Sequence, residues 1–235
     1  MRTQKQKYFI TQINLILVIL LLNNNIFRAQ TEVVVGPCPC PWHCTQTWMT
    51  MNLNTDRFRN GDLIPEAKTP QEWIAANNNK QPAWCYYENN PANGDVYGKL
   101  YNWYAINDER GLAPFGWHIP NSGDWALLDT IFGGKTIAGN SFKSFHGWFK
   151  DGGGDHTSVL NALPGGYRLS SGTFKSIGED GAWWSSTEEA YIDIFNKYIP
   201  TDRAYRYQAT YKYSVVSYEK IQKNYGFSVR CLRDN

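Results

Sequence analysis

Tyrosine and alanine alternate with polar residues along one stretch near the C-terminal end of the chain. The odd positions hold Tyr205, Tyr207, Ala209, Tyr211 and Tyr213. The even positions hold Arg206, Gln208, Thr210, Lys212 and Ser214. Residues two apart lie on the same face of a strand, so this period of two predicts a half-buried β-strand. Segments 214–218 and 226–232 are expected to form two more strands, which makes the last third of the chain mostly antiparallel sheet.

Helical signals lie before this sheet region. The segment 69–72 supplies a threonine N-cap, a proline at the first helical position and a glutamate that can reach back, so we expect a helix over 70–77. After the cap residues at 121–124, Trp125, Leu128 and Ile131 recur at helical spacing until the glycines at 133–134, which predicts a second helix. Helices early and sheet late are typical of the α+β class.

Aromatic side chains are expected to supply much of the core. The 235 residues include 10 Trp, 15 Tyr and 11 Phe, which together make up 15% of the chain. Trp117, Trp125, Trp183 and Trp184 can each bury a large apolar area. We therefore interpret these four tryptophans as core residues rather than ligand contacts.

The first 29 residues have the layout of a secretory signal peptide. A polar, cationic start is followed by the apolar run 13–22, with a cleavage site expected near Ala29 or Gln30. The run is shorter than the roughly 20 apolar residues that cross a bilayer, so no membrane span is expected after its removal. We expect an exported protein that ends in the periplasm, on the cell surface or outside the cell.

The small positive charge of the chain belongs to this leader. The whole chain carries 23 Lys+Arg against 21 Asp+Glu. Four of the bases, and no acid, lie in residues 1–29, so the remainder balances at 19 minus 21, or −2. A nucleic-acid partner is not expected, because binding to phosphates needs a clustered basic surplus.

Five cysteines become disulfide candidates if the protein is exported: Cys38, Cys40, Cys44, Cys85 and Cys231. Their odd number leaves at least one without an intrachain partner, and the sequence does not choose the pairs. Three of them lie in residues 30–47, which we interpret as a Cys/Pro-rich N-terminal extension. A Cys₃His metal site with His43 is the alternative there, but the ligand spacing is unfavourable.

Five motifs then follow in order along the chain. They are Tyr97-Gly-Lys-Leu-Tyr-Asn-Trp-Tyr104, Gly116-Trp-His-Ile-Pro120, Asn161-Ala-Leu-Pro-Gly-Gly-Tyr-Arg168, Trp183-Trp-Ser-Ser-Thr187 and Gly226-Phe-Ser-Val-Arg-Cys231. This series resembles the Fibrobacter succinogenes major paralogous domain family, found in exported and surface proteins of bacteria. The expected domain covers residues 48–235, with 48–53 as its opening strand.

The resemblance implies a C-type-lectin-like fold, with an antiparallel sheet, two or three short helices and long irregular loops. It also implies a distant similarity to the formylglycine-generating, sulfatase-modifying group, although the family itself has no settled activity. The segment 112–114 lacks a cysteine that many members carry, which leaves Cys85 as the candidate partner of Cys231 inside the domain. The connection 191–202 is longer than the family's usual one.

Catalytic patterns are weak in this sequence. Formylglycine formation needs a pair of active cysteines, and Cys85 and Cys231 are expected to be bridged instead. The four histidines show no ligand spacing, and no Gly-x-Ser-x-Gly elbow occurs. We therefore expect no enzyme activity and no cofactor. Asp151 and Asp155 flank a glycine loop that could hold a hard cation, but a solvated loop is the preferred interpretation.

The candidate ligand-binding residues lie in or beside the long connection: Tyr191, Tyr198, Arg203 and Arg206. Aromatic and arginine side chains suit contact with carbohydrate or protein. The sequence predicts an exported, non-catalytic binding or adhesion domain that recognises a surface polysaccharide or a protein without calcium. An enzyme derived from the sulfatase-modifying lineage and a purely structural envelope module are the alternatives.

Overall fold

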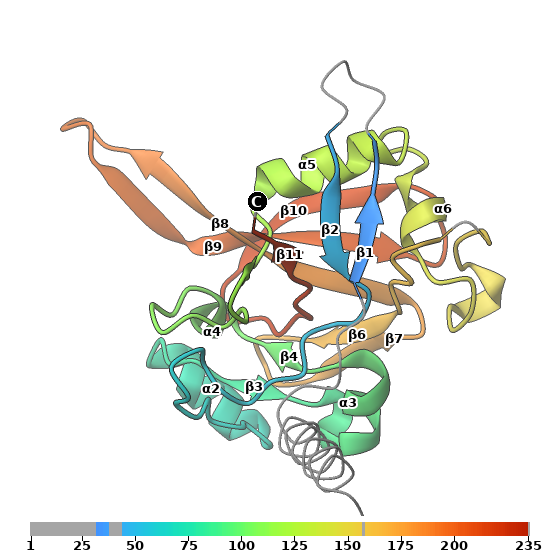
Figure 1. Cartoon of the computed structure of the whole chain (residues 1–235). Helices are drawn as coiled ribbons and strands as arrows, with labels where there is room; N and C mark the ends of the chain where they lie inside the picture. The colour runs from blue at the N-terminus through green and yellow to red at the C-terminus, as the bar shows by residue number, and fades with distance from the viewer. Residues whose placement is uncertain (1–31, 38–43, 157, 235) are drawn as a thin grey trace, which may run out of the picture. The chain divides into compact units, whose positions relative to one another are not determined.

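A computed structural model describes residues 32–37, 44–156 and 158–234 of the chain (Figure 1). The predicted signal peptide lies outside these residues. Among the described residues, no helix has the length and apolar character needed to cross a membrane.

A five-stranded sheet forms the centre of the described unit. Its strands run in the order β10, β9, β8, β6 and β7, with the bounds Val216–Gln222, Tyr198–Thr210, Asp180–Ile192, Gly165–Arg168 and Phe174–Ile177. Neighbours are antiparallel, apart from β6 and β8, which pair in parallel at Gly166 and Gly181. β8 and β9 have 13 residues each, so this hairpin is long enough to reach beyond its neighbours.

A smaller sheet joins the two ends of the described chain. It has the order β1, β2, β11 and β5, with the bounds Glu32–Val35, Gln46–Met49, Leu232–Arg233 and Trp117–His118. Leu232 pairs with both Trp48 and His118. β1 falls within the predicted N-terminal extension, and it continues the domain's own sheet by pairing with β2. A third pair consists of β3 (Trp84–Cys85) and β4 (Leu100–Tyr101).

Both predicted helices are present, as α2 (Pro70–Asn78) and α5 (Ser122–Ile131). Each begins with a capping box, formed by Thr69 with Glu72 and by Asn121 with Asp124. The described residues also contain α3 (Pro91–Tyr97), α4 (Trp103–Ile106), α6 (Ala138–Phe142) and the 3₁₀ turns η1 (Tyr87–Asn89) and η2 (Phe149–Asp151). Five α-helical segments thus replace the expected two or three, because the extra ones are too short to show a periodic pattern. The fold is α+β.

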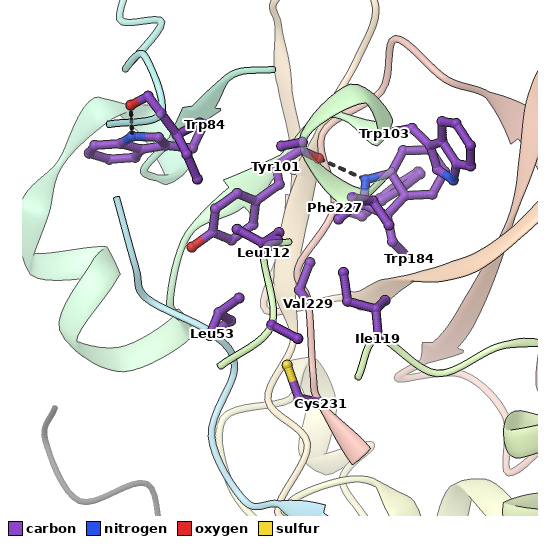
Figure 2. Packing of buried hydrophobic residues seen from close by; sticks show 14 of the residues in the cluster. Leu53, Trp84, Tyr101, Trp103, Leu112, Ile119, Trp184, Phe227, Val229 and Cys231 are labelled. Atoms are coloured by element: carbon purple, nitrogen blue, oxygen red, sulfur yellow. Dashed lines mark hydrogen bonds between the residues drawn. The ribbon is translucent and has the colours of Figure 1, made fainter. Parts of the chain in front are cut away.

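Hydrophobic residues pack on both faces of the central sheet. On one face, the rings of Trp125 and Tyr207 stack with centroids 4.3 Å apart, and Trp48 lies against Trp125. On the other face, Trp184 packs against Phe227 and Tyr101, as Figure 2 shows. Trp117 is only half-buried, so three of the four tryptophans expected in the core are fully buried there.

The strand predicted over residues 205–213 is confirmed as the end of β9, although the strand is shorter than expected. Tyr207 and Ala209 are buried as expected, whereas β9 ends at Thr210 and Tyr213 is exposed. The polar residue Arg206 faces the second hydrophobic cluster and lies over Phe227. The polar face of β9 is thus partly covered as well, since Arg206, Gln208 and Thr210 are half-buried.

The other two predicted strands are shifted or shorter. β10 starts at Val216, two residues later than expected, and extends to Gln222. Residues 226–228 form isolated bridges, such as Tyr101 with Phe227, and only Leu232 and Arg233 form a strand. The buried residues of this segment cross between the sheets instead of extending one of them.

Candidate functional site

The connection that the sequence singles out is not a loop but the outer part of the β8–β9 hairpin. We call residues 188–202 the arm. Register shifts lie between Trp184 and Glu188 and between Glu188 and Ala190, where the hairpin leaves the sheet. β10 accompanies β9 only as far as the pair Gln222 and Arg203. Beyond that point the arm extends as a two-stranded ribbon away from the sheet (Figure 1).

A rigid turn closes the arm. The amide of Asp193 donates to the carbonyl of Lys197 at 3.0 Å, and the amide of Asn196 donates to the carbonyl of Asp193 at 3.0 Å. Asn196 has a φ of 59°, so this is a three-residue loop with a left-handed residue at its bulge. The Asp193 carboxylate accepts from the amides of Phe195 and Lys197 at 2.9 Å each. Four hydrogen bonds thus fix the backbone of the turn.

This turn presents two large apolar side chains to solvent. Ile194 is 93% exposed and Phe195 is 82% exposed. Adjacent side chains on the ribbon are also exposed, among them Ile192 at 67%. Apolar residues held outward by a fixed backbone lose little conformational freedom on contact with another molecule.

The two tyrosines predicted to bind ligand lie on opposite faces of the arm. Tyr191 pairs with Ile199, and Ile192 pairs with Tyr198. Side chains directly opposite each other share a face, and successive residues alternate. Each face therefore carries one exposed tyrosine and one isoleucine, and the two rings do not line a common concavity.

Charged residues connect the base of the arm to β10 and to Lys223, the residue that follows β10. Glu188 contacts Lys223 at 2.7 Å, and Glu189 contacts Lys220 at 2.7 Å. The hydrogen bond from Lys220 lowers the pKa of Glu189 below its usual range, with a further contribution from Thr201. These contacts hold the root of the ribbon while its tip stays clear of the sheet.

The two predicted arginines lie away from the tip. Arg203 is exposed at the base of the arm, where it pairs with Gln222. Arg206 is half-buried, contacts Glu219 at 3.2 Å and lies 5.3 Å above the Phe227 ring. The structure thus places Tyr191 and Tyr198 on the ribbon, Arg203 at its base, and Arg206 against the core.

The large apolar residues most exposed on the arm were missed in the sequence: Ile192, Ile194 and Phe195. A signal for them exists, because Asp193 and Asn196 are turn-forming residues between two apolar segments. That pattern predicts a hairpin, and apolar residues inside its turn have no core to face.

The ammonium group of Lys143 lies beside the glycine loop that the sequence offers as a weak metal site. The Lys143 ammonium donates to the carbonyls of Gly152 at 2.6 Å and Thr210 at 3.2 Å. A Cβ on Gly154 would lie 2.1 Å from the Lys143 carbonyl, so glycine is needed here for close packing. Asp151 and Asp155 are exposed at its ends. In the described part of the chain no group of three or more His, Cys, Asp or Glu could hold a metal ion.

His118, within the second motif, lies between two acidic side chains. Its Nδ1 is 2.8 Å from Asp234 and its Nε2 is 3.4 Å from Asp124. Asp124 also caps α5. The histidine therefore connects the start of α5 to Asp234, near the end of the described residues.

The expected bridge between Cys85 and Cys231 is wrong, because both are buried free thiols. Cys85 belongs to a small cluster with Trp73, whereas Cys231 packs in the main cluster with Val229 (Figure 2). Burial raises the pKa of each thiol to about 12. Cys38 and Cys40 lie outside the described residues, and the disulfide prediction for Cys44 depends on them.

The fold defines a class of domain: an α+β unit with an aromatic core on both faces of its sheet and a protruding hairpin. The sequence profile of the Fibrobacter succinogenes major domain matches residues 42–233. The chain belongs to this family. No curated protein and no solved structure gives a significant match.

Proposed function

We propose that this protein is an exported, non-catalytic binding domain whose arm docks on another protein at the bacterial cell surface. One observation carries the proposal: Ile194 and Phe195 are held outward on a turn that four hydrogen bonds fix. Large apolar residues at the centre of an interface often supply most of its binding energy. The signal-like leader supports export. We also propose that the fold is C-type-lectin-like, as the family resemblance implies.

A partner explains the arm better than a purely structural role does. A structural module gains stability by burying apolar side chains, whereas the tip buries almost none of Ile194 and Phe195. The ribbon is nevertheless well specified, with a continuous register from Ala190 to Ile192. Clustered and rigid exposed apolar residues are typical of interaction sites.

Protein is favoured over carbohydrate as the partner. A sugar ring stacks on an aromatic face while neighbouring polar side chains bind its hydroxyls, but Tyr191 and Tyr198 lie on opposite faces of the ribbon. The side chains of Ile194 and Phe195 offer no hydrogen bonds. An apolar groove on a partner protein that encloses both faces and the tip of the arm fits this shape. Such binding needs no calcium.

An enzyme of the sulfatase-modifying lineage receives no support from the thiols. Such chemistry uses a thiolate, and a pKa of about 12 leaves Cys85 and Cys231 protonated near neutral pH. Both side chains are also buried. The binding interpretation is therefore the stronger of the two.

Site-specific photo-crosslinking tests the proposal. A photoreactive phenylalanine analogue replaces Phe195 in one variant and Phe115, which is 79% exposed outside the arm, in a matched control. In cells that make the protein, we expect a discrete protein adduct from position 195 and none from position 115. Equal adducts from both positions, or none from position 195, would contradict the proposal.

A further inference from the structure

An open apolar groove lies where β1 ends next to α5 and α6. Its volume is about 250 Å³, and the large apolar side chains that line it are Val34, Val35, Pro37, Ile131, Phe132 and Val159. Ser141 adds one hydroxyl, and none of the described residues that line the groove is charged. Pockets for small molecules are typically larger, at about 300–1,000 Å³, and more enclosed. The groove is therefore suited to apolar side chains from another segment of protein.

Two valines of this groove are exposed to solvent. Val34 lies on β1, the edge strand of the smaller sheet, and Val159 lies in the segment that follows the glycine loop. Exposed apolar side chains that gather in one place are typical of interaction sites. The groove thus has the composition of a surface that another molecule covers.

The same chain carries a projection with matching properties. At the tip of the arm, Ile194 and Phe195 are exposed, and the hydrogen bonds of the turn hold them in place. These two residues and the described lining of the groove include no charged side chain, so contact between them would desolvate no charge. The tip is convex and the groove is concave, so they can form the two halves of a single contact.

The tip cannot reach the groove of its own chain. β9 has 13 residues, so its two ends lie about 40 Å apart at about 3.3 Å per residue. The arm is at one end, whereas the amide of Gly139 in α6 donates to the carbonyl of Ser214, four residues beyond the other end. Figure 1 likewise shows α6, which supplies Ser141 to the groove, far from the arm. The tip that fills the groove must therefore come from another molecule, and a second copy carries it in the same rigid form.

We infer that the tip of the arm of one copy docks in the groove of a second copy, so that copies associate head to tail. Because the tip and the groove are different surfaces of one chain, each bound copy still offers a free tip or a free groove to the next. A buried aromatic side chain contributes about 150–250 Å², so two anchors and their groove stay below the about 1,000 Å² of a stable interface. Association should therefore be weak in dilute solution and favoured where many copies are concentrated on one surface. This inference rests on the proposed function and names a second copy as the partner of the arm.

Two variants of the full chain, each lacking one half of the contact, test the inference. The tip variant, Ile194→Ser with Phe195→Ser, removes the projection and leaves the groove. Val34→Lys places a charge in the groove and leaves the tip, and it spares the core because Val34 is already exposed. Val96→Lys, at an exposed valine of α3, is the matched control.

Sedimentation from about 10 µM to about 1 mM protein, the range in which small interfaces associate, should give a wild-type mass that rises beyond two chains. We expect the tip variant and Val34→Lys each to weaken association at least about tenfold, since an apolar anchor or its site is lost. Val96→Lys should change association less than about twofold. An equal mixture of the tip variant and Val34→Lys should form pairs, because one supplies a groove and the other a tip, and the mass of these pairs should stop at two chains.

Three results would overturn the inference. They are a wild type that stays monomeric over this range, association of Val34→Lys equal to that of wild type, and a mixture of the two variants that does not pair. The second result would mean that copies meet tip to tip, or that residues 38–43 of the same chain fill the groove.

Photo-crosslinking at Phe195 distinguishes this inference from the proposed function. An adduct with the mass of two chains supports both. An adduct with a different protein overturns the inference and leaves the proposed function intact, whereas the absence of any adduct contradicts both.

Discussion

Trp183 and Trp184 are consecutive residues of β8, and each lies in a different hydrophobic cluster. The Trp183 indole donates to Asn52 Oδ1 at 2.8 Å, and the Trp184 indole donates to the Tyr101 carbonyl at 2.7 Å. Both side chains are fully buried. β8 therefore links the two halves of the core while its far end forms one strand of the arm.

Replacement of either tryptophan should destabilise the protein strongly. We expect Trp183→Ala and Trp184→Ala each to lower the free energy of unfolding by about 3–5 kcal/mol, because each leaves a large cavity. The Phe variants should cost about 1–3 kcal/mol through the lost hydrogen bond. Denaturant unfolding measures these changes, with Phe115→Ala as an exposed control expected within about 0.5 kcal/mol. Losses as small as the control's would contradict the two-sided core.

Local signals explain which parts of the fold the sequence predicts. The starts of α2 and α5 depend on side chains three residues apart, such as Thr69 and Glu72, and both were predicted. The burial of Arg206 depends on Phe227, which is distant in sequence. A period of two shows that a strand has two faces, but not that a second cluster covers the polar one.

In the candidate site, too, local sequence signals predict some features, whereas features that depend on distant contacts could not be predicted. Tyr191 and Tyr198 were identified as residues of an unusual connection, and both lie on the arm. Their placement on opposite faces follows from the register, which the left-handed bulge at Asn196 sets. The free state of Cys85 and Cys231 could not be predicted either, because it depends on how far apart the two hydrophobic clusters that contain these cysteines lie.

The turn of the arm should lose its order when its carboxylate is removed. Asp193→Ala deletes the acceptor of the Phe195 and Lys197 amides. We expect faster amide exchange at these two positions and little change in the global free energy of unfolding, because the arm lies outside the core. Asp193→Asn keeps an acceptor and should exchange more slowly than the alanine variant. Exchange in the alanine variant as slow as in the wild type would show that the carboxylate does not order the turn.

The two buried thiols should be inert in the folded protein. With a pKa of about 12 and no exposure, Cys85 and Cys231 should resist a maleimide at pH 8 and react fully after unfolding. Mass spectrometry of the peptides that contain them reports each site separately. Rapid labelling of either cysteine in the native state would revive the alternative of thiol chemistry.

Asp129 should give stability an unusual pH dependence. Burial raises the pKa of its carboxyl above the ordinary 3.8, although the hydrogen bond donated by Tyr207 opposes this shift. Its contribution to stability is fully present below pH 3.8 and is lost as the pH rises through the raised value. Relative to wild type, Asp129→Asn should therefore gain stability as the pH rises over that range.

Asp62 supplies a control of opposite sign. Hydrogen bonds from Asn60 and Arg110 lower the pKa of this exposed carboxyl. Its contribution is present above its ordinary pKa and is lost as the pH falls through the lowered value. Denaturant unfolding of Asp129→Asn and Asp62→Asn from pH 3 to pH 7 should give differences from wild type that change in opposite directions. Parallel changes would contradict the assignment for Asp129.

Retention on washed cell envelopes tests the arm as a binding site most directly. The wild type, the double variant Ile194→Ser with Phe195→Ser, and the exposed control Phe115→Ser are compared by the fraction of protein that stays bound. We predict that the double variant loses at least about tenfold in retention, since two apolar anchors are removed, while the control binds like wild type. Equal retention of all three proteins would contradict the arm as the site of binding.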